Sequence, residues 1–111
     1  MDKLTQYRQH IRDILEYHCR LDSKIAGMET YTAFDTVQDH YQVINVGWDD
    51  GQRPYGCLIH VDIKDEKIWI QYDGTEYSIA QELIDLGVPP QSIVVAYQAP
   101  AARKFTEFAI G

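Results

Sequence analysis

The chain has 111 residues, and 45% of them are hydrophobic, which is enough for one domain that builds its core without disulfide or metal staples. Asp and Glu total 17 against 10 Lys and Arg, so the net charge is −7. Sequence-independent affinity for DNA comes largely from Lys and Arg, and an acidic surface repels phosphate backbones. The composition therefore argues against a dedicated DNA-binding domain.

Two cysteines, Cys19 and Cys57, show neither a CxxC motif nor any other paired spacing. We expect both to be packing residues, with Cys57 on the core face of a strand, because metal and redox sites usually show clustered ligands. The sequence has no secretory leader and no apolar run near the roughly 20 residues that span a bilayer. We therefore expect a reduced, cytoplasmic protein that does not enter a membrane.

The first predicted element is a helix over residues 4–21. Its apolar side chains recur at intervals of three and four, which is typical of an amphipathic helix that lies on a sheet. They are Leu4, Tyr7, Ile11, Ile14, Leu15 and His18. Residues 28–36 then alternate and predict a first strand. One of its sides carries Met28, Thr30, Thr32 and Phe34.

An antiparallel meander follows, with strands predicted at residues 40–48, 55–64 and 67–72. The first two are joined by a loop rich in Asp, Gly and Pro, which tolerate turn geometry. The last two are joined by Asp65 and Glu66, which suit a two-residue hairpin turn.

The hairpin turn sets the register of the strands on either side of it. Because strand side chains alternate with period two, one face of this ribbon is continuously apolar. Counting outward from the turn places Ile63 opposite Ile68, Val61 opposite Ile70 and Ile59 opposite Tyr72. The expected core face consists of Ile59, Val61, Ile63, Ile68 and Ile70.

The reverse face of the ribbon is the candidate partner surface. It is expected to carry Leu58, His60, Asp62, Trp69 and Gln71. Exposed aromatic side chains concentrate binding energy, so we expect the surface around Trp69 to contact a protein partner or a second copy of the chain.

A second helix is predicted over residues 75–86, with Asp73 or Thr75 as its cap and Gly87 just past its end. A short β-branched run at 92–97, a loop at 98–102 and a final edge strand at 106–110 complete the chain. The order of elements predicts an α+β fold in a single domain, residues 1–111. It has an N-terminal helix, an antiparallel meander of about four strands, a second helix and one or more short C-terminal strands.

The candidate chemistry is limited to His60 and Asp62, which stand two apart and so share a strand face. Such a pair can ligate a metal or act as acid and base, but no third ligand is spaced to complete a site of the usual kind. An ordinary polar face around Trp69 is the favoured interpretation. Asp39 and His40 fall near a turn, where carboxylates usually stabilise the turn itself. We expect no catalytic residue, no cofactor and no metal.

Several strings in the chain resemble the recognisable strings of one protein family. They are MDKLTQYRQHI at the start, VGWD at 46–49, YGCLIHVDIKD at 55–65, KIWIQYDGTE at 67–76, LGVP at 86–89 and FAIG at 108–111. With these strings, essentially the whole chain resembles the XisI family of cyanobacterial excision controlling factors. The resemblance implies a role in the programmed excision of a DNA element, the fdxN element, that interrupts a nitrogen-fixation gene. A separate recombinase and a partner factor called XisH are also implied, and no active site is marked.

Three functions follow as hypotheses. The preferred one is a non-enzymatic accessory factor that binds a XisH-like protein and so controls excision. The second is an architectural DNA-binding factor, which the acidic charge disfavours: Arg103 and Lys104 form the one adjacent basic pair, and no helix-turn-helix, basic region or zinc-finger spacing is present. The third is a metal-dependent hydrolase or nuclease that uses His60 and Asp62.

Overall fold

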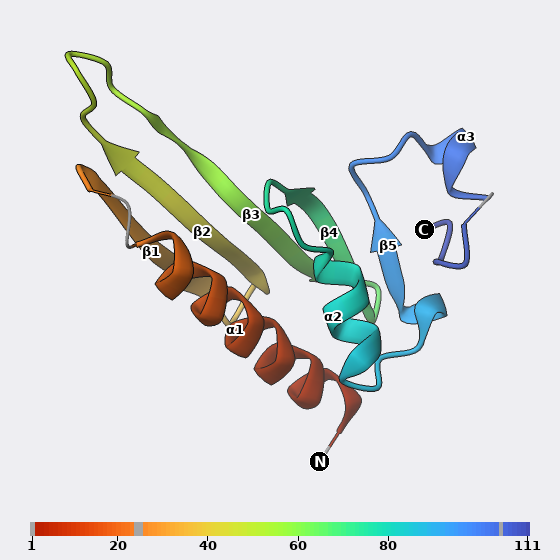
Figure 1. Ribbon diagram of the computed structural model, residues 1–111. Coiled ribbons are helices and arrows are strands. Elements are labelled where there is room, and N and C mark those ends of the chain that lie inside the picture. Colours follow the sequence, from red (N-terminus) through yellow and green to blue (C-terminus); the bar gives the residue numbers. More distant parts are fainter. Residues whose placement is uncertain (1, 24–25, 105) are drawn as a thin grey trace.

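The computed structural model describes residues 2–23, 26–104 and 106–111. Its framework is a five-stranded sheet, and the two longer helices lie on one face of that sheet (Figure 1). The predicted α+β class and the predicted order of the main elements are both confirmed. No helix in the described part of the chain is long and apolar enough to cross a membrane.

The first helix, α1, spans Lys3–Asp22 and begins at the N-cap Asp2, whose carboxylate accepts a hydrogen bond from the Thr5 N–H at 2.8 Å. Its apolar stripe faces the sheet as predicted. The buried members of that stripe are Tyr7, Ile11, Ile14, Leu15 and His18. Leu4 is only partly buried against the core.

Four antiparallel strands form the meander: β1 (Met28–Asp35), β2 (His40–Gly47), β3 (Tyr55–Lys64) and β4 (Lys67–Asp73). They lie side by side in chain order, as the sequence predicts. Each strand presents alternate residues to the helices, and the buried ones form the core. On β2, β3 and β4 these are Tyr41, Val43, Ile59, Val61, Ile68 and Ile70.

The turn between β3 and β4 is the predicted two-residue hairpin. Asp65 and Glu66 have φ values of 54° and 62°, and Lys64 pairs with Lys67 across the turn. Two successive positive φ values are those of a type I′ turn, whose twist matches that of the flanking strands. The local sequence therefore defines the start of this ribbon.

A register shift further along the ribbon alters the predicted pairing. Ile63 lies opposite Ile68 and Val61 opposite Ile70, as expected, but Tyr72 lies opposite His60 rather than Ile59. Gln71 is the extra residue on β4, as in a β-bulge. The prediction that Tyr72 faces the core is wrong, because the bulge turns it to the other side, where it is 51% exposed.

A second shift lies between β2 and β3. Val43 pairs with Ile59 and Ile44 pairs with Cys57, so Leu58 is the extra residue. The bulge exchanges two predicted positions: Cys57 stands beside Ile44 on the face away from the helices, and Leu58 packs against the core. Cys57 is therefore not on the core face, and Leu58 is not part of the reverse face.

The second helix, α2, spans Ile79–Asp85 and starts later than predicted. Its N-cap is Ser78, whose hydroxyl accepts from the Gln81 N–H at 3.1 Å. Asp73 also contacts the start of the helix: its carboxylate accepts a hydrogen bond from the Ile79 N–H at 3.1 Å. Gly87, at φ 98°, ends the helix as predicted.

The last part of the chain departs most from the prediction. A 3₁₀ turn, η1 (Pro90–Ser92), leads into β5 (Ile93–Val95), which pairs in parallel with β4. A short helix, α3 (Pro100–Arg103), replaces part of the expected loop. The strand expected at 106–110 is absent from the described residues there. The Ala109 N–H donates to the Ile93 carbonyl at 2.9 Å, a single bond that makes no ladder.

Candidate functional site

One face of the sheet is packed against α1 and α2 (Figure 1). The opposite face, which we call the open face, carries partly buried and exposed side chains. The strand registers arrange this face into rows that run across the strands. One row, read from β1 to β4, consists of Asp35, His40, Asp62 and Trp69. The neighbouring row, read in the same direction, consists of Ala33, Gln42, His60 and Tyr72.

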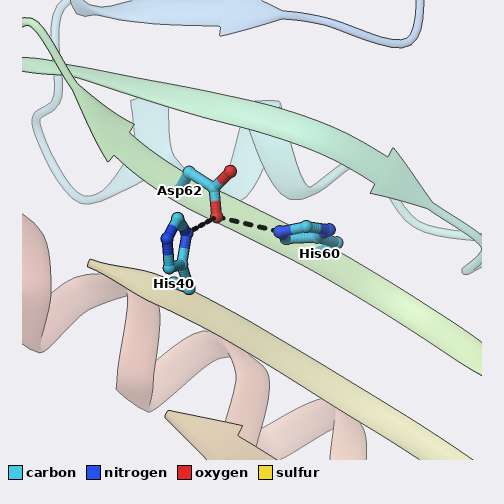
Figure 2. A group of neighbouring side chains, drawn as sticks. All are labelled: His40, His60 and Asp62. Atoms are coloured by element: carbon cyan, nitrogen blue, oxygen red, sulfur yellow. Dashed lines mark hydrogen bonds and ion pairs between the residues drawn. The ribbon is translucent and has the colours of Figure 1, made fainter. Parts of the chain in front are cut away.

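The centre of the open face is a cluster of His40, His60 and Asp62 (Figure 2). Asp62 Oδ1 lies 2.9 Å from His40 Nδ1 and 2.8 Å from His60 Nε2. A carboxylate only accepts hydrogen bonds, so each of these ring nitrogens carries the proton that it donates. Two imidazoles therefore converge on one oxygen atom. The Asp62 side chain is 14% exposed, against 53% for His40.

Gln71 completes the surroundings of the carboxylate. Its Nε2 donates to Asp62 Oδ2 at 3.2 Å, so both carboxylate oxygens are engaged. Gln71 is the bulged residue of β4, and bulges commonly re-aim a side chain. The orientation of Asp62 is thus held by contacts from three strands.

The cluster changes the acid-base behaviour of His40. The hydrogen bond to Asp62 raises the pKa of His40 above its usual value, and the charge on Asp62 adds to the effect. Asp35 and Asp39 raise it further, by smaller amounts, while partial burial opposes the shift. The exposed end of the cluster therefore carries positive charge more readily than an isolated histidine does.

Trp69 differs from its predicted role as a free aromatic contact. Its indole N–H donates to the Lys64 carbonyl at 3.1 Å, and Lys64 Nζ lies 4.1 Å from the ring centroid. The Arg103 guanidinium lies 5.9 Å from the same centroid, and Gly111 stands beside the ring. Trp69 is partly buried, and its ring and indole N–H already contact groups of this chain.

Of the five predicted surface residues, the structure brings together His60, Asp62 and Gln71. Trp69 pairs with Asp62 across the strands but is covered, and Leu58 turns to the core. The sequence reasoning missed His40. The expectation that no third ligand accompanies His60 and Asp62 is wrong, because His40 lies directly opposite Asp62 on β2.

The missed residue depends on the β3 bulge. Val46 pairs with Tyr55 near the loop, and counting from that pair without a bulge would place His40 opposite Val61. The extra residue at Leu58 moves the pairing by one and sets His40 against Asp62. Gly56, two residues before Leu58, is a local signal for a bulge, because glycine inside a strand often accompanies one, but it does not fix the position of the extra residue.

Three other titratable residues, the two cysteines and His18, have structural explanations. Burial raises the pKa of the Cys19 and Cys57 thiols, which makes them poor nucleophiles at neutral pH. His18, on α1, is buried and its Nε2 lies 2.8 Å from Glu82 Oε2 on α2. This bond links the two helices on the covered face.

Comparison with protein families matches residues 1–110 to the XisI protein family. The chain belongs to the XisI family. The resemblance read from the sequence is therefore confirmed along almost its whole length. Among curated protein sequences, none matches the chain.

Two solved XisI structures are similar to this one. A XisI-like protein from Anabaena variabilis shares 38% identity over 98% of this chain and 100% of its own, with a TM-score of 0.92. The fdxN element excision controlling factor XisI from the same organism shares 32% identity over 99% of this chain and 100% of its own, with a TM-score of 0.88. This XisI-family chain thus has the same fold as both over nearly all of its residues, and it is a homologue of an excision controlling factor.

Proposed function

We propose that this XisI-family protein is a non-enzymatic controlling factor that binds a XisH-like protein and thereby regulates excision of a DNA element. The observation that supports this proposal is the open face of the sheet. One face of the sheet is used for the core, while the other presents an ordered polar cluster beside exposed aromatic residues.

An apolar and aromatic part of the open face lies on β1, β2 and β3, with tyrosines on β1 and β3 and aliphatic residues on β2. Tyr31 pairs with Ile44, and Ile44 pairs in turn with Cys57. In the next row Val46 pairs with Tyr55, which is 74% exposed. Tyrosine is enriched in interfaces, because its ring offers a large apolar contact and its hydroxyl offers a hydrogen bond. This region suits the apolar centre of a protein interface.

The charge of the chain favours a protein partner over nucleic acid. A net charge of −7 attracts basic surfaces and repels phosphate backbones. Asp62 is already bonded to three side-chain donors, which lowers its availability as a general base. Partner binding therefore accounts for the open face better than catalysis does.

The test is co-purification of this chain with the XisH-like protein of the same genome, followed by calorimetric titration of the two purified proteins. We expect a stable complex, and a loss of affinity of about tenfold or more when Tyr31→Ser and Tyr55→Ser are combined, because buried aromatic contacts dominate interfaces. Tyr17→Ser is the matched control, since Tyr17 is a half-exposed tyrosine on α1.

Two results would contradict the proposal. One is that both proteins are folded by circular dichroism yet elute separately at all concentrations tried. The other is that the double tyrosine variant binds as tightly as the parent chain while the Tyr17 variant does not. Light scattering on the chain alone would test self-association, which remains a prediction.

The DNA-binding alternative rests on a small group of basic residues around Trp69. Lys64 lies over the ring and Arg103 stands near it, but the Arg103 guanidinium donates to three backbone carbonyls. These contacts leave few cations for phosphates. Fluorescence anisotropy with element-end DNA across a salt series decides between the functions, and we expect no salt-sensitive binding at micromolar protein.

A further inference from the structure

The cluster of His40, His60 and Asp62 offers three metal-ligating atoms on neighbouring central strands. One ring nitrogen of each histidine and one carboxylate oxygen of Asp62 all lie within 4.8 Å of one another. Imidazole nitrogen and carboxylate oxygen are the donor atoms that zinc and other first-row transition metals commonly accept. Figure 2 shows the two rings on either side of Asp62, with dashed lines from both to the same carboxylate oxygen.

We propose that His40, His60 and Asp62 together bind one divalent transition-metal ion, with Zn²⁺ as the reference ion. This inference goes beyond the proposed function, because metal binding at the cluster requires no partner. The cluster of His40, His60 and Asp62 would then bind a metal ion, while the tyrosines of the open face would contact the protein partner.

The distances from the two histidine nitrogens to Asp62 Oδ1 are close to those that such an ion needs. The two nitrogens lie 2.9 Å and 2.8 Å from Asp62 Oδ1. Tetrahedral ligands at zinc bond lengths of about 2.0–2.1 Å stand roughly 3.4 Å apart, so each ring has to move by about half an ångström. We attribute this adjustment to rotation of the His40 and His60 side chains, with the strand register unchanged.

Binding also has a defined proton balance. The ring nitrogens that now donate to Asp62 must present lone pairs to the ion. In a neutral histidine the proton moves to the other ring nitrogen, and in an imidazolium it leaves to solvent. The Asp62 carboxylate loses the two hydrogen bonds that it accepts from the histidines and binds the metal ion in their place.

Gln71 has the position of an outer-shell partner. Its amide donates to Asp62 Oδ2, which leaves Oδ1 directed at the two histidines. Hydrogen bonds of this kind hold a ligating carboxylate in the orientation that binding requires. The neighbouring carboxylates of Asp35 and Asp39 add negative charge around His40, which also favours a cation.

The donor set selects among metals. Mg²⁺ and Ca²⁺ prefer sites built from oxygen ligands, so two imidazoles disfavour both ions. Zn²⁺, Co²⁺, Ni²⁺ and Cu²⁺ accept this combination. Three protein ligands leave a fourth position for water or for a side chain of another protein.

The experiment is calorimetric titration of tag-free protein, first stripped of metal with a chelator, with Zn²⁺ and separately with Mg²⁺. We expect one Zn²⁺ per chain with micromolar or tighter affinity, no response to Mg²⁺, and a visible absorption band when Co²⁺ is added instead. Zn²⁺ should also raise the melting temperature, because an ion that binds only the folded state stabilises it.

Variants assign the signal to the cluster. His60→Ala and Asp62→Asn should each abolish the stoichiometric binding, and Gln71→Leu should weaken it by about 10–100-fold while leaving all three ligands in place. His10→Ala is the matched control, since His10 lies on α1 outside the cluster, and it should bind as the parent does. Circular dichroism checks that each variant folds.

The inference is overturned if the parent chain shows no stoichiometric Zn²⁺ binding. It is equally overturned if a folded His40→Ala, His60→Ala double variant still binds one ion with parental affinity. Because neither titration contains the XisH-like protein, failure here leaves the partner proposal standing, and failure of that complex leaves the metal site standing.

Discussion

The two faces of the sheet are made by alternating residues of the same strands, yet they are specified by different physical effects. Ile59 is fully buried beneath the helices, while its neighbour His60 belongs to the polar cluster on the open face. The covered face relies on burial of apolar area, which is non-directional and tolerates small shifts. The open face relies on hydrogen bonds, which depend on register within a fraction of an ångström.

The largest expected effect tests this contrast with two adjacent residues on β3. Ile59→Ala should lower the free energy of unfolding by about 2–5 kcal/mol, because it leaves a cavity in the core. His60→Ala should cost about 1 kcal/mol or less, since it removes one partly exposed hydrogen bond. Urea denaturation of both variants provides the measurement. Equal losses would mean that the open face contributes to stability as much as the core does.

A second prediction concerns close packing at the end of β2. A Cβ atom added to Gly47 would lie 2.5 Å from Met28 Sδ and 2.6 Å from the Gly27 carbonyl oxygen. We expect Gly47→Ala to destabilise the protein by about 1–3 kcal/mol, because the neighbouring backbone must move. Gly56→Ala on β3 is the control, with no atom within 4 Å of its added Cβ. Thermal unfolding that ranks the two variants the other way would contradict this account.

A third prediction uses pH at the covered face. Tyr41 is buried, and its hydroxyl donates to Asp39 Oδ1 at 2.8 Å. Burial, together with the bond to Asp39, raises the pKa of Tyr41 to about 12. The folded state therefore holds this proton more tightly than the unfolded state does. The resulting stability is fully present below about pH 10, the usual tyrosine pKa, and is lost as the pH rises through about 12.

Tyr41→Phe isolates this contribution. The variant should be less stable than the parent by about 1–2 kcal/mol at neutral pH, because a hydrogen bond to a charged group is lost. That difference should shrink between pH 10 and pH 12, since Phe has no proton to lose. Denaturation at several pH values measures it, and Tyr72→Phe on the open face is the control. A difference that stays constant with pH would rule out the titration of Tyr41 as its source.

The smallest predicted effect is a gain at the hairpin turn, which belongs to neither face. Glu66 adopts a φ of 62°, a left-handed conformation that glycine adopts without strain. Glu66→Gly should raise the free energy of unfolding by about 0.5–1 kcal/mol. Glu16→Gly, at an exposed position of α1, should lower it by about 1 kcal/mol. A loss in both variants would show that the turn is not strained at Glu66.

Much of the covered face could be predicted from the sequence. The helical spacing on α1, the alternation of the strands and the Asp65-Glu66 turn each act over a few residues, so they can be read locally. They predicted the buried stripe of α1 and most core residues of β3 and β4, including Ile68 and Ile70, and they predicted the order of the four antiparallel strands. Because many apolar contacts act together, the loss of one of them would not change which face of the sheet is buried or the order of the strands.

The open face was decided by the tertiary structure. Two bulges, at Leu58 and Gln71, moved Cys57 and Tyr72 outward and placed His40 against Asp62. The position of a bulge depends on how two strands pair and on how both pack against the helices, so neither strand specifies it alone. The cover on Trp69 comes from Lys64 and from the distant Arg103. Chain periodicity thus determined the fold and its core, whereas the site arose from long-range register, which only the packed sheet could set.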